Sequence, residues 1–395
     1  MTPWLIAAGD FTPWGGMDRA NYELAWYLAD RLDTPVHLVA HRVDAPLADH
    51  PRVIAHVVPR PLKMHLLGGP LLAQRTRALA RELSRQGARI VVNGGNCCWP
   101  DVNWVHAVHA AWANRTSHAP APVRWRAALM KQAAIRDECR ALRAARVIVA
   151  NSHVARRQIM EHAGIPGDRA QVVYYGIDGN LFRPHSPAEK AAARTKLALP
   201  FAIPMVCFIG ALGHDRNKGF DMLFKAWRHL CSDPDWDVVL LAAGAGAEVD
   251  HWKRQIRNCG LERHIRMVGF TKDIPGLLAA ADAMVHPTHY EAYGLGVHEA
   301  LCCGLPAIVT ASAGIAERYP EDLNPLLLGS PPRAEGIVDA LRRWRADQKG
   351  FAAKVAPFAA RLRERAWTDM ARDIVELVTG PTAAQTGASQ PPAEP

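Results

Sequence analysis

Short apolar runs rich in β-branched residues alternate with segments of helical pattern along almost the whole chain. Continuous apolar runs of this length are typical of strands buried on both faces of a parallel sheet, with the intervening helices as crossovers. The alternation therefore predicts an α/β protein rather than an all-helical or all-β fold. The expected strands are Trp4–Ala8, Val36–Ala40, Val53–Val58, Arg89–Val92, Trp104–Val108, Val147–Ala150, Val172–Tyr175, Met205–Ile209, Val238–Ala242, Ile265–Val268, Ala283–His286, Ala307–Thr310 and Pro325–Leu328.

A proline-punctuated stretch near the middle of the chain marks a domain boundary. Pro184, Pro187, Pro200 and Pro204 flank a short alanine-rich helical pattern there. Because single cores stop growing near ~250–300 residues, a chain of 395 residues is expected to form two cores. We therefore expect two Rossmann-like, doubly wound parallel-sheet domains that face each other across a cleft, where ligands bind at the carboxyl ends of the strands.

The expected organisation has five parts. An N-terminal domain covers residues 1–185, a linker covers 186–204, and a second domain covers 205–357. A C-terminal helix at 358–380 is expected to pack back toward the N-terminal domain. Residues 381–395 have no apolar period and are expected to form a disordered tail.

One stretch after an expected strand, residues 286–306, combines two carboxylates with several glycines. Glu291 falls in the loop before a helix expected to start around 294–296, and Glu299 lies inside that helix. A glycine-rich helix N-terminus favours an anion such as a diphosphate. A carboxylate further along the helix can accept hydrogen bonds from a vicinal diol, as in a ribose. The alternative is an ordinary strand–helix unit with two surface glutamates.

The stretch 286–306 resembles the E-x7-E signature of retaining glycosyltransferases with the GT-B fold, specifically glycosyltransferase family four. The resemblance implies transfer of a sugar from a nucleotide-diphosphate sugar to a hydroxyl acceptor, with retained anomeric configuration, in glycan, polysaccharide or glycolipid biosynthesis. Other segments that look like the family are Asn151–Ser152, Tyr175–Asp178, Phe182–Pro184, Phe208–Gly210, Lys218–Asp221, Val268–Phe270, Ala281–Asp282 and Gly314–Glu317.

The resemblance implies a donor site in the second half of the chain. Glu299 would bind the ribose hydroxyls, Glu291 would contact the hydroxyls of the donor sugar, and Lys218 would neutralise the diphosphate. The backbone of four residues would cradle the sugar and diphosphate, and one loop would select the base. The four cradle residues are Ala292, Tyr293, Gly294 and Leu295, and the base-selecting loop contains Gly269 and Phe270.

One position departs from the family pattern. The family usually has arginine directly after the glycine that ends the strand, and here that residue is Ala211. Departure of a diphosphate needs positive charge where negative charge develops on the leaving oxygen. Arg216 is the nearest candidate to supply it beside Lys218, and the alternative is a solvated loop arginine.

The same resemblance implies two ligand contacts from the first half. Gly15 and Gly16 follow the first strand and would let the backbone come close to the donor diphosphate and the acceptor. His109 is predicted to point at the donor sugar, with His106 as the second choice. A buried structural histidine is an equally good interpretation of this strand end.

Neither a metal nor an organic cofactor is expected. His106 and His109 have H-x-x-H spacing, as does a pair that begins at His286, but in strands and loops this spacing does not converge on a metal as it can on a helix. The D-x-D sequence at 233–235 lies in a turn-like context before a strand. We therefore predict a metal-independent transferase.

Positive charge is concentrated in the first half of the chain. Residues 1–185 contain 23 Lys/Arg and 14 Asp/Glu, whereas residues 186–395 contain 24 of each. Seven of these basic side chains lie on a helix expected at 123–146. We interpret it as a surface helix, with contact to anionic lipid or a phosphorylated acceptor as the alternative. Its expected packed face carries Ala128, Ile135, Cys139 and Leu142.

The charge distribution favours an acceptor that is an anionic or membrane-associated glycan, and no nucleic-acid motif accompanies it. Eight cysteines without C-x-x-C spacing, and an N-terminus without a cationic start or long apolar run, predict a cytoplasmic protein with reduced thiols. No run approaches the ~20 apolar residues of a membrane span. The predicted location is the cytoplasm, including the inner face of the membrane.

Two rival functions fit the same layout. One is another enzyme of the fold, a nucleotide-sugar epimerase or a phosphorylase that carries pyridoxal phosphate on a lysine. The other is a non-catalytic protein that binds nucleotide-sugars, for which Ala211 is the only hint in the sequence.

Overall fold

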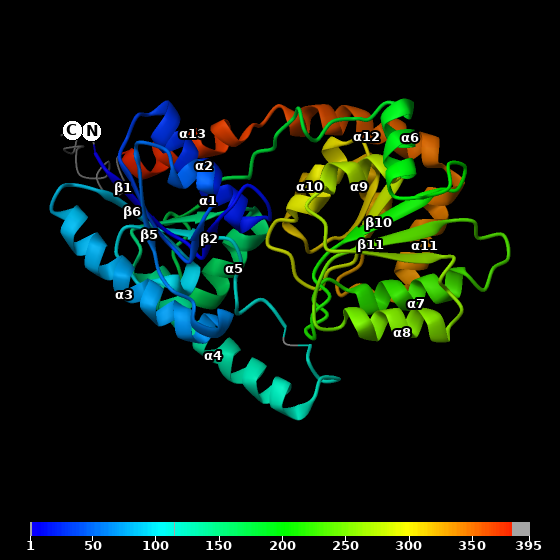
Figure 1. Ribbon diagram of the computed structural model, residues 1–395, viewed down its shortest axis with the longest axis horizontal. Coiled ribbons are helices and arrows are strands. Elements are labelled where there is room, and N and C mark those ends of the chain that lie inside the picture. The colour runs from blue at the N-terminus through cyan, green and yellow to red at the C-terminus, as the bar shows by residue number, and fades with distance from the viewer. Residues whose placement is uncertain (1, 114, 381–395) are drawn as a thin grey trace, which may run out of the picture.

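The computed structural model describes residues 2–113 and 115–380, which fold into two lobes that are each built on a parallel sheet (Figure 1). We call the lobe with the seven-stranded sheet the N lobe and the lobe with the six-stranded sheet the C lobe. All strand pairs are parallel, which confirms the α/β class with two Rossmann-like sheets. The arrangement follows from the alternation of apolar runs and helices, because parallel strands need helical crossovers.

The N-lobe sheet has the order β5-β3-β1-β6-β7-β8-β9, and a separate two-stranded sheet pairs β2 with β4. The first half of the chain forms β1 (Trp4–Ala7), β2 (Asp10–Phe11), α1 (Met17–Trp26) with a π-helical turn Tyr27–Arg31, β3 (Val36–Ala40), β4 (Arg42–Val43), α2 (Ala45–Ala48), β5 (Val53–Val57), a 3-10 turn Pro61–Lys63, α3 (His65–Ser84), β6 (Arg89–Asn93), a 3-10 turn Gly94–Asn96, β7 (Val102–Val105), α4 (Ala121–Ala144), β8 (Val147–Ala150), α5 (His153–Ala163) and β9 (Ala170–Val172).

The C-lobe sheet has the order β12-β11-β10-β13-β14-β15. The second half forms α6 (Pro187–Lys196), β10 (Met205–Ile209), α7 (Phe220–Leu230), β11 (Val239–Ala243), α8 (Val249–Asn258), β12 (Ile265–Gly269), α9 (Ile274–Ala280), β13 (Ala283–His286), α10 (Leu295–Cys302), β14 (Ala307–Thr310), 3-10 turns Gly314–Arg318 and Glu321–Leu326, β15 (Leu327–Leu328), α11 (Ala334–Ala346), α12 (Gln348–Arg363) and α13 (Trp367–Thr379).

Two expected strands are misplaced. The run Trp104–Val108 was expected as a strand, but β7 is Val102–Val105, because Val102 pairs with β6 and β8 while Val108 turns away and donates its backbone N–H to Tyr290 Oη at 2.6 Å. The run Val172–Tyr175 was expected as another, but β9 ends at Val172, because the following tyrosines pack at the junction of the lobes. The short β2–β4 pair has too few residues to leave an apolar pattern.

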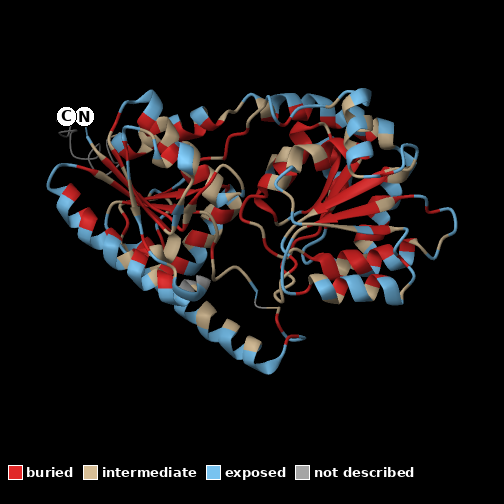
Figure 2. Cartoon of the chain, viewed as in Figure 1, coloured by how far each residue is buried: buried red, intermediate tan, exposed pale blue. Residues whose placement is uncertain are grey.

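The core of each lobe lies on its sheet, and the strands are buried along most of their length (Figure 2). Trp104, Trp227 and Trp344 are the largest fully buried side chains. The buried strands carry few polar groups, so the polar residues that could bind a ligand gather in the loops at the strands' carboxyl ends.

The lobes are held together by hydrogen bonds that cross between them. The Glu317 carboxylate of the C lobe accepts the backbone N–H groups of His153 and Val154 at 2.8 and 2.9 Å, which caps the start of α5. Ser152 Oγ donates to the backbone oxygen of Ala292 at 2.6 Å. A Cβ added at Gly314 would lie 2.1 Å from that same oxygen, so only glycine permits this approach.

The C-terminal helices connect back to the N lobe. Helix α12 ends at Arg363, and α13 then contacts α1 beside the N-lobe sheet (Figure 1). Ile177 and Ala366 form an isolated parallel bridge at this return. The boundaries at 185, 204 and 357 stay predictions, and the expected tail at 381–395 lies outside the described residues.

Helix α4 packs on the N lobe only over its second half. Leu142 is buried as expected, but Ala128 is exposed, because the first half of the helix extends away from the lobe (Figure 2). Trp125 and Leu129 on this extension are 71% and 70% exposed. Among the helices in the described part of the chain, none is long and apolar enough to cross a membrane.

Candidate functional site

The site is built around the loop that joins β13 to α10. Gly294 forms the N-cap of α10 at φ +105°, a backbone conformation that glycine adopts without steric cost. A Cβ there would also lie 3.0 Å from Ile315 Cγ2. The helix therefore starts at Leu295, where its first backbone N–H groups have no partner within the helix and can bind an anion.

A lysine and a histidine flank the first of the two carboxylates. Lys218 Nζ donates to Glu291 Oε2 at 2.5 Å, and His286 Nε2 lies 3.2 Å from the same oxygen. Burial alone would raise the pKa of Glu291, but Lys218 and His286 outweigh it and lower that pKa to about 2. Burial lowers the pKa of His286. Glu291 is therefore ionised at every physiological pH.

Close contact between two loops places Lys218 beside Glu291. Gly219 has φ +70°, and a Cβ there would lie 1.8 Å from the backbone oxygen of Pro287. Asn217 bridges the same loops, since its backbone oxygen accepts from His289 N at 2.8 Å and its Nδ2 donates to Tyr290 O at 3.0 Å. The loops after β10 and β13 thus form one rigid edge.

The second carboxylate has a different environment. Glu299 lies within α10, and in the described part of the chain its carboxylate forms no hydrogen bond or ion pair. Burial raises its pKa to about 7, and the opposing effect of the Arg19 charge from the N lobe is smaller. An unpaired, partly buried carboxylate can accept both hydroxyls of a diol without first breaking a protein contact.

In the backbone between the two glutamates, carbonyl oxygens already accept hydrogen bonds from the protein. The oxygens of Ala292 and Tyr293 accept from Ser152 Oγ and from Ile315 N, each at 2.6 Å. The buried phenol of Tyr293 accepts from Arg318 at 3.0 Å. This fixes the carbonyl side of the segment inside the protein, so that Gly294 and Leu295 can present their N–H side to a ligand.

Arg216 lies in the same loop as Lys218 but has a different partner. Its Nε and Nη2 donate to the two oxygens of Glu248 at 2.8 and 3.1 Å, and its guanidinium lies over the Trp252 ring. It is thus not a solvated loop arginine, and it does not contact the Lys218–Glu291 pair. Its assignment to the leaving group stays a prediction.

The glycine loop of the N lobe lies opposite the loop after β12. Gly15 has φ +88°, and Gly16 is the N-cap of α1. Lys272 Nζ lies 4.0 Å from the centroid of the Trp14 ring, which brings the two loops together. Gly269 has φ +81°, and the Phe270 side chain that follows is 69% exposed and free to contact a ligand.

The two candidate histidines occupy distinct positions. His106 directly follows β7, and its Nδ1 lies 2.5 Å from Tyr175 Oη. Burial lowers its pKa to about 3, which makes it neutral. His109 lies in the loop beyond, with its Nδ1 2.9 Å from the buried Glu138 carboxylate, which raises its pKa. His106 thus stands at the strand end, whereas His109 lies three residues further along the loop. The assignment of His109, or of His106 as the second choice, to the donor sugar stays a prediction.

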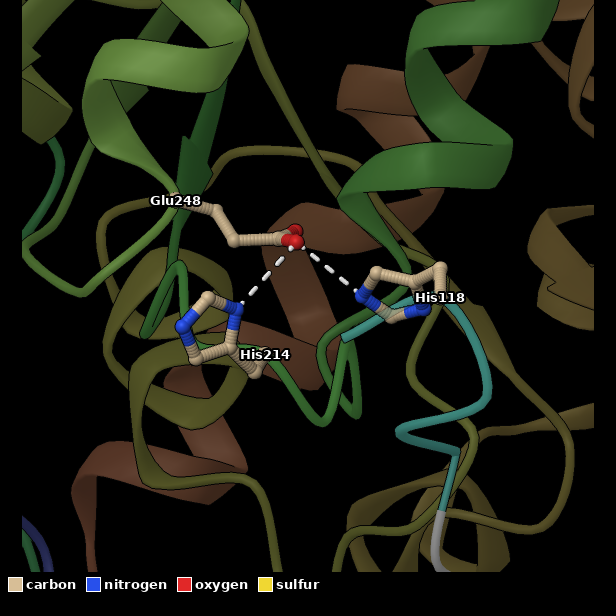
Figure 3. A group of neighbouring side chains, drawn as sticks. All are labelled: His118, His214 and Glu248. Carbon is tan, nitrogen blue, oxygen red and sulfur yellow. Dashed lines mark ion pairs between the residues drawn. The ribbon is translucent and has the colours of Figure 1, made fainter. Parts of the chain in front are cut away.

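Sequence reasoning missed a second polar group where the lobes meet. His118 of the N lobe and His214 of the C lobe both approach Glu248 (Figure 3). These residues come from three distant segments with no motif spacing, so no signal in the sequence joins them.

The D-x-D sequence at 233–235 was expected to form a turn, and the structure agrees, since Asp235 N donates to Asp233 Oδ1 at 3.1 Å.

Comparisons with known proteins assign both halves of the chain to glycosyltransferase families. Residues 14–180 match the family model "Glycosyltransferase Family 4", and residues 189–366 match "Glycosyl transferases group 1". A D-inositol 3-phosphate glycosyltransferase of Corynebacterium aurimucosum is 28% identical over 50% of this chain. The matched part of the chain spans about half the length of that relative (48%).

Two solved structures share the fold across nearly the whole chain. WaaG, a glycosyltransferase involved in lipopolysaccharide biosynthesis, superposes with a TM-score of 0.77 at 18% identity, covering 96% of this chain and 100% of that one. HepE of Anabaena in complex with UDP-glucose gives a TM-score of 0.71 at 20% identity and the same coverage.

Proposed function

Because the chain belongs to the glycosyltransferases of group 1 and family 4, with the GT-B fold, we propose that it transfers a sugar from a nucleotide-diphosphate sugar to a hydroxyl acceptor in glycan biosynthesis. The observation that carries the proposal is the edge formed by Lys218, Glu291 and the N-terminus of α10. The unpaired Glu299 lies further along the same helix.

The donor is proposed to lie along this edge in a fixed order. Glu299 accepts the ribose hydroxyls, and the N–H groups at Gly294 and Leu295 bind the diphosphate together with Lys218. The ionised Glu291 accepts from hydroxyls of the transferred sugar. HepE was solved with UDP-glucose, which supports a uridine nucleotide as the first donor to test.

The proposed transfer retains the anomeric configuration. The bond from the anomeric carbon to the diphosphate oxygen breaks, and the acceptor oxygen bonds to the same carbon on the same face. The acceptor proton passes to the departing phosphate oxygen, so no side chain is needed as a base. Lys218 and the helix N-terminus stabilise the charge that develops on the diphosphate. His109, or His106 in its place, would face the sugar from the N lobe.

We propose that the transfer does not use a metal for this charge. The cationic Lys218 and the start of α10 supply positive potential at the diphosphate, the role that an ion fills in D-x-D enzymes. The D-x-D sequence here is used otherwise, because Asp233 forms a turn and lies 3.8 Å from Arg342. Turnover that persists in a chelator, and that added Mg²⁺ or Mn²⁺ leaves unchanged, is the expected result.

The acceptor is proposed to be an anionic or membrane-associated glycan at the cytoplasmic face of a membrane. The excess of nine positive charges lies in residues 1–185. The exposed Trp125 and Leu129 share the extended half of α4 with Arg124 and Arg126, a combination that suits an anionic lipid interface. Co-sedimentation with phosphatidylglycerol vesicles, lost in Trp125→Glu/Leu129→Glu and absent with phosphatidylcholine, is expected.

The activity is tested by nucleoside diphosphate release from uridine, guanosine and adenosine diphosphate sugars. We expect turnover of one base class, lost in Lys218→Ala and preserved in Lys225→Ala, which removes an exposed lysine on the neighbouring α7. Proton NMR of the product tests the stereochemistry, and an inverted anomeric centre would contradict retention. Turnover equal in both variants would contradict the assigned site.

The rival functions give different results in the same assay. An epimerase converts the nucleotide-sugar without releasing the nucleoside diphosphate, and a phosphorylase with pyridoxal phosphate absorbs in the near ultraviolet. A non-catalytic binding protein would bind the nucleotide but release nothing in any acceptor mixture. This last test is needed because Ala211 stands where the family usually has arginine.

A further inference from the structure

We propose that His118, His214 and Glu248 form a zinc-type metal site that bridges the two lobes (Figure 3). Their nearest ligand atoms all lie within 4.8 Å of one another, and they are the one group of this kind in residues 2–113 and 115–380. This site is separate from the Lys218–Glu291 edge and does not depend on the proposed transfer.

The distances suit a small cation with tetrahedral coordination. His118 Nε2 lies 3.0 Å from Glu248 Oε1, and His214 Nδ1 lies 3.5 Å from the same oxygen. Ligands bound tetrahedrally at the usual zinc distances stand about 3.4 Å from each other, so the observed separations bracket that value. The third separation, between the two histidine nitrogens, is within 4.8 Å.

His214 forms a long ion pair with Glu248. Its Nδ1 is buried, and 3.5 Å from the carboxylate it is too far for a good hydrogen bond. A separation of 3.5 Å between the ring nitrogen and the carboxylate oxygen is close to that of two ligands on one zinc ion, so an ion can bind both atoms. Two imidazoles and one carboxylate select zinc or a neighbouring transition metal over Mg²⁺ or Ca²⁺.

Arg216 fixes the carboxylate in the required orientation. Its Nε donates to Glu248 Oε2 at 2.8 Å, which is the oxygen turned away from the histidines. An ion on Oε1 would replace the longer 3.1 Å contact from Nη2 and leave the Nε bond in place. Such an outer partner is a common feature of metal-bound carboxylates.

The loops place these residues by tight backbone packing. Glu248 is only 4% exposed and follows Gly246, where a Cβ would lie 2.2 Å from the backbone oxygen of Leu212. This contact holds the loop after β11 against the loop that carries His214. His118 reaches them from the N-lobe loop between β7 and α4, next to the 3.9 Å pair of Arg115 with Asp221. A bound ion would therefore join the lobes.

The test uses untagged full-length protein in equilibrium dialysis against Zn²⁺, with Co²⁺ as a spectroscopic probe. We expect one equivalent of Zn²⁺, visible absorption bands of tetrahedral Co²⁺, and no binding of Mg²⁺. His118→Ala and His214→Ala should each weaken Zn²⁺ binding about tenfold or more. Both variants keep the Arg216–Glu248 pair and are expected to fold, which circular dichroism checks. His229→Ala, an exposed histidine at the end of α7, is the matched control.

Two results of the dialysis would overturn the proposal. Absence of stoichiometric binding, or binding that both histidine variants retain, would show that no ion is held here. Loss in His214→Ala with full retention in His118→Ala would show a site of the C lobe alone. A rise in Tm with Zn²⁺ in the wild type and His229→Ala, but not in the two variants, would agree with an ion that links the lobes.

Discussion

The two carboxylates of the β13–α10 segment are eight residues apart but have opposite environments. Glu291 in the loop is paired with Lys218 and His286, and its pKa falls to about 2. Glu299 in the helix has no such partner, and burial raises its pKa to about 7. Glu291 is thus already paired within the protein, whereas Glu299 is the carboxylate that we propose a ligand pairs with.

The two carboxylates also differ in their effect on the stability of the fold. A carboxylate with a lowered pKa stabilises the fold above its ordinary titration range, whereas one with a raised pKa costs stability there. Binding sites often keep such unpaired groups at a cost to the fold. The predictions that follow separate the two carboxylates by chemistry, by affinity, by pH and by stability.

The largest expected effect is on turnover by Glu291→Gln. The substitution removes the charge that holds Lys218 in place and the acceptor for the sugar hydroxyls. We expect kcat to fall about 10²–10³-fold, the range for loss of one preorganised electrostatic contact. Affinity for the nucleoside diphosphate alone should fall less than in Lys218→Ala, because the lysine itself remains. Glu262→Gln, an exposed glutamate of the C lobe, is the control and should keep full turnover.

The second effect is on affinity, and it belongs to Glu299. Loss of the ionised carboxylate in Glu299→Gln should weaken nucleoside diphosphate binding about tenfold, since a charged hydrogen bond is worth ~1.5–3 kcal/mol. Isothermal calorimetry of the nucleoside diphosphate measures it. Equal losses of affinity in Glu291→Gln and Glu299→Gln would remove the distinction between the two positions.

A pH dependence should follow from the same group. Only the ionised form of Glu299 accepts both ribose hydroxyls, so nucleoside diphosphate affinity should fall as the pH drops below about 7, by at most tenfold per pH unit. Glu291, with a pKa of about 2, contributes nothing in this range. Below pH 7 the affinity of the wild type should fall more steeply than that of Glu299→Gln, in which the terminal phosphate of the nucleotide, with a second pKa of ~6, still titrates. Equal slopes in the two proteins would assign the titration elsewhere.

The smallest expected effect is on stability, and its sign differs between the two carboxylates. The raised pKa of Glu299 costs stability that grows from pH ~4.5 to about 7 and is then constant. Glu299→Gln should therefore raise Tm at pH 8 by a few degrees, at ~2–4 °C per kcal/mol, and less at pH 5. Glu291→Gln should lower Tm at both pH values, because the substitution removes a charge that stabilises the fold at every pH above ~4.5. Differential scanning calorimetry of both variants and the wild type at pH 5 and pH 8 measures these shifts in Tm.

The sequence predicted the local part of this site well. Gly294 and Gly304 mark the ends of α10, because a left-handed backbone at each end requires glycine, and the helix runs as expected between them. The strand that precedes it, Ala283–His286, was also predicted to the residue. Both depend on interactions between near neighbours in the chain, which a sequence pattern records directly.

Contacts between the lobes could not be predicted. Glu248 looks like an ordinary loop glutamate in the sequence, and its burial arises only when His118 and Arg216 close around it. The ends of β7 and β9 were missed for a similar reason, since Val108 and Tyr175 leave their strands to contact the other lobe. Such contacts join residues far apart in the chain, where no spacing rule applies.

The central proposal, that a nucleoside diphosphate binds along the edge of Lys218 and α10, is tested most directly by calorimetry. Uridine, guanosine and adenosine diphosphates are titrated into the wild type, Lys218→Ala and the control Lys225→Ala. We expect one of them to bind the wild type and the control equally, and to bind Lys218→Ala at least about tenfold more weakly. Equal affinity in all three proteins, or no binding of any nucleotide to the wild type, would contradict the proposal.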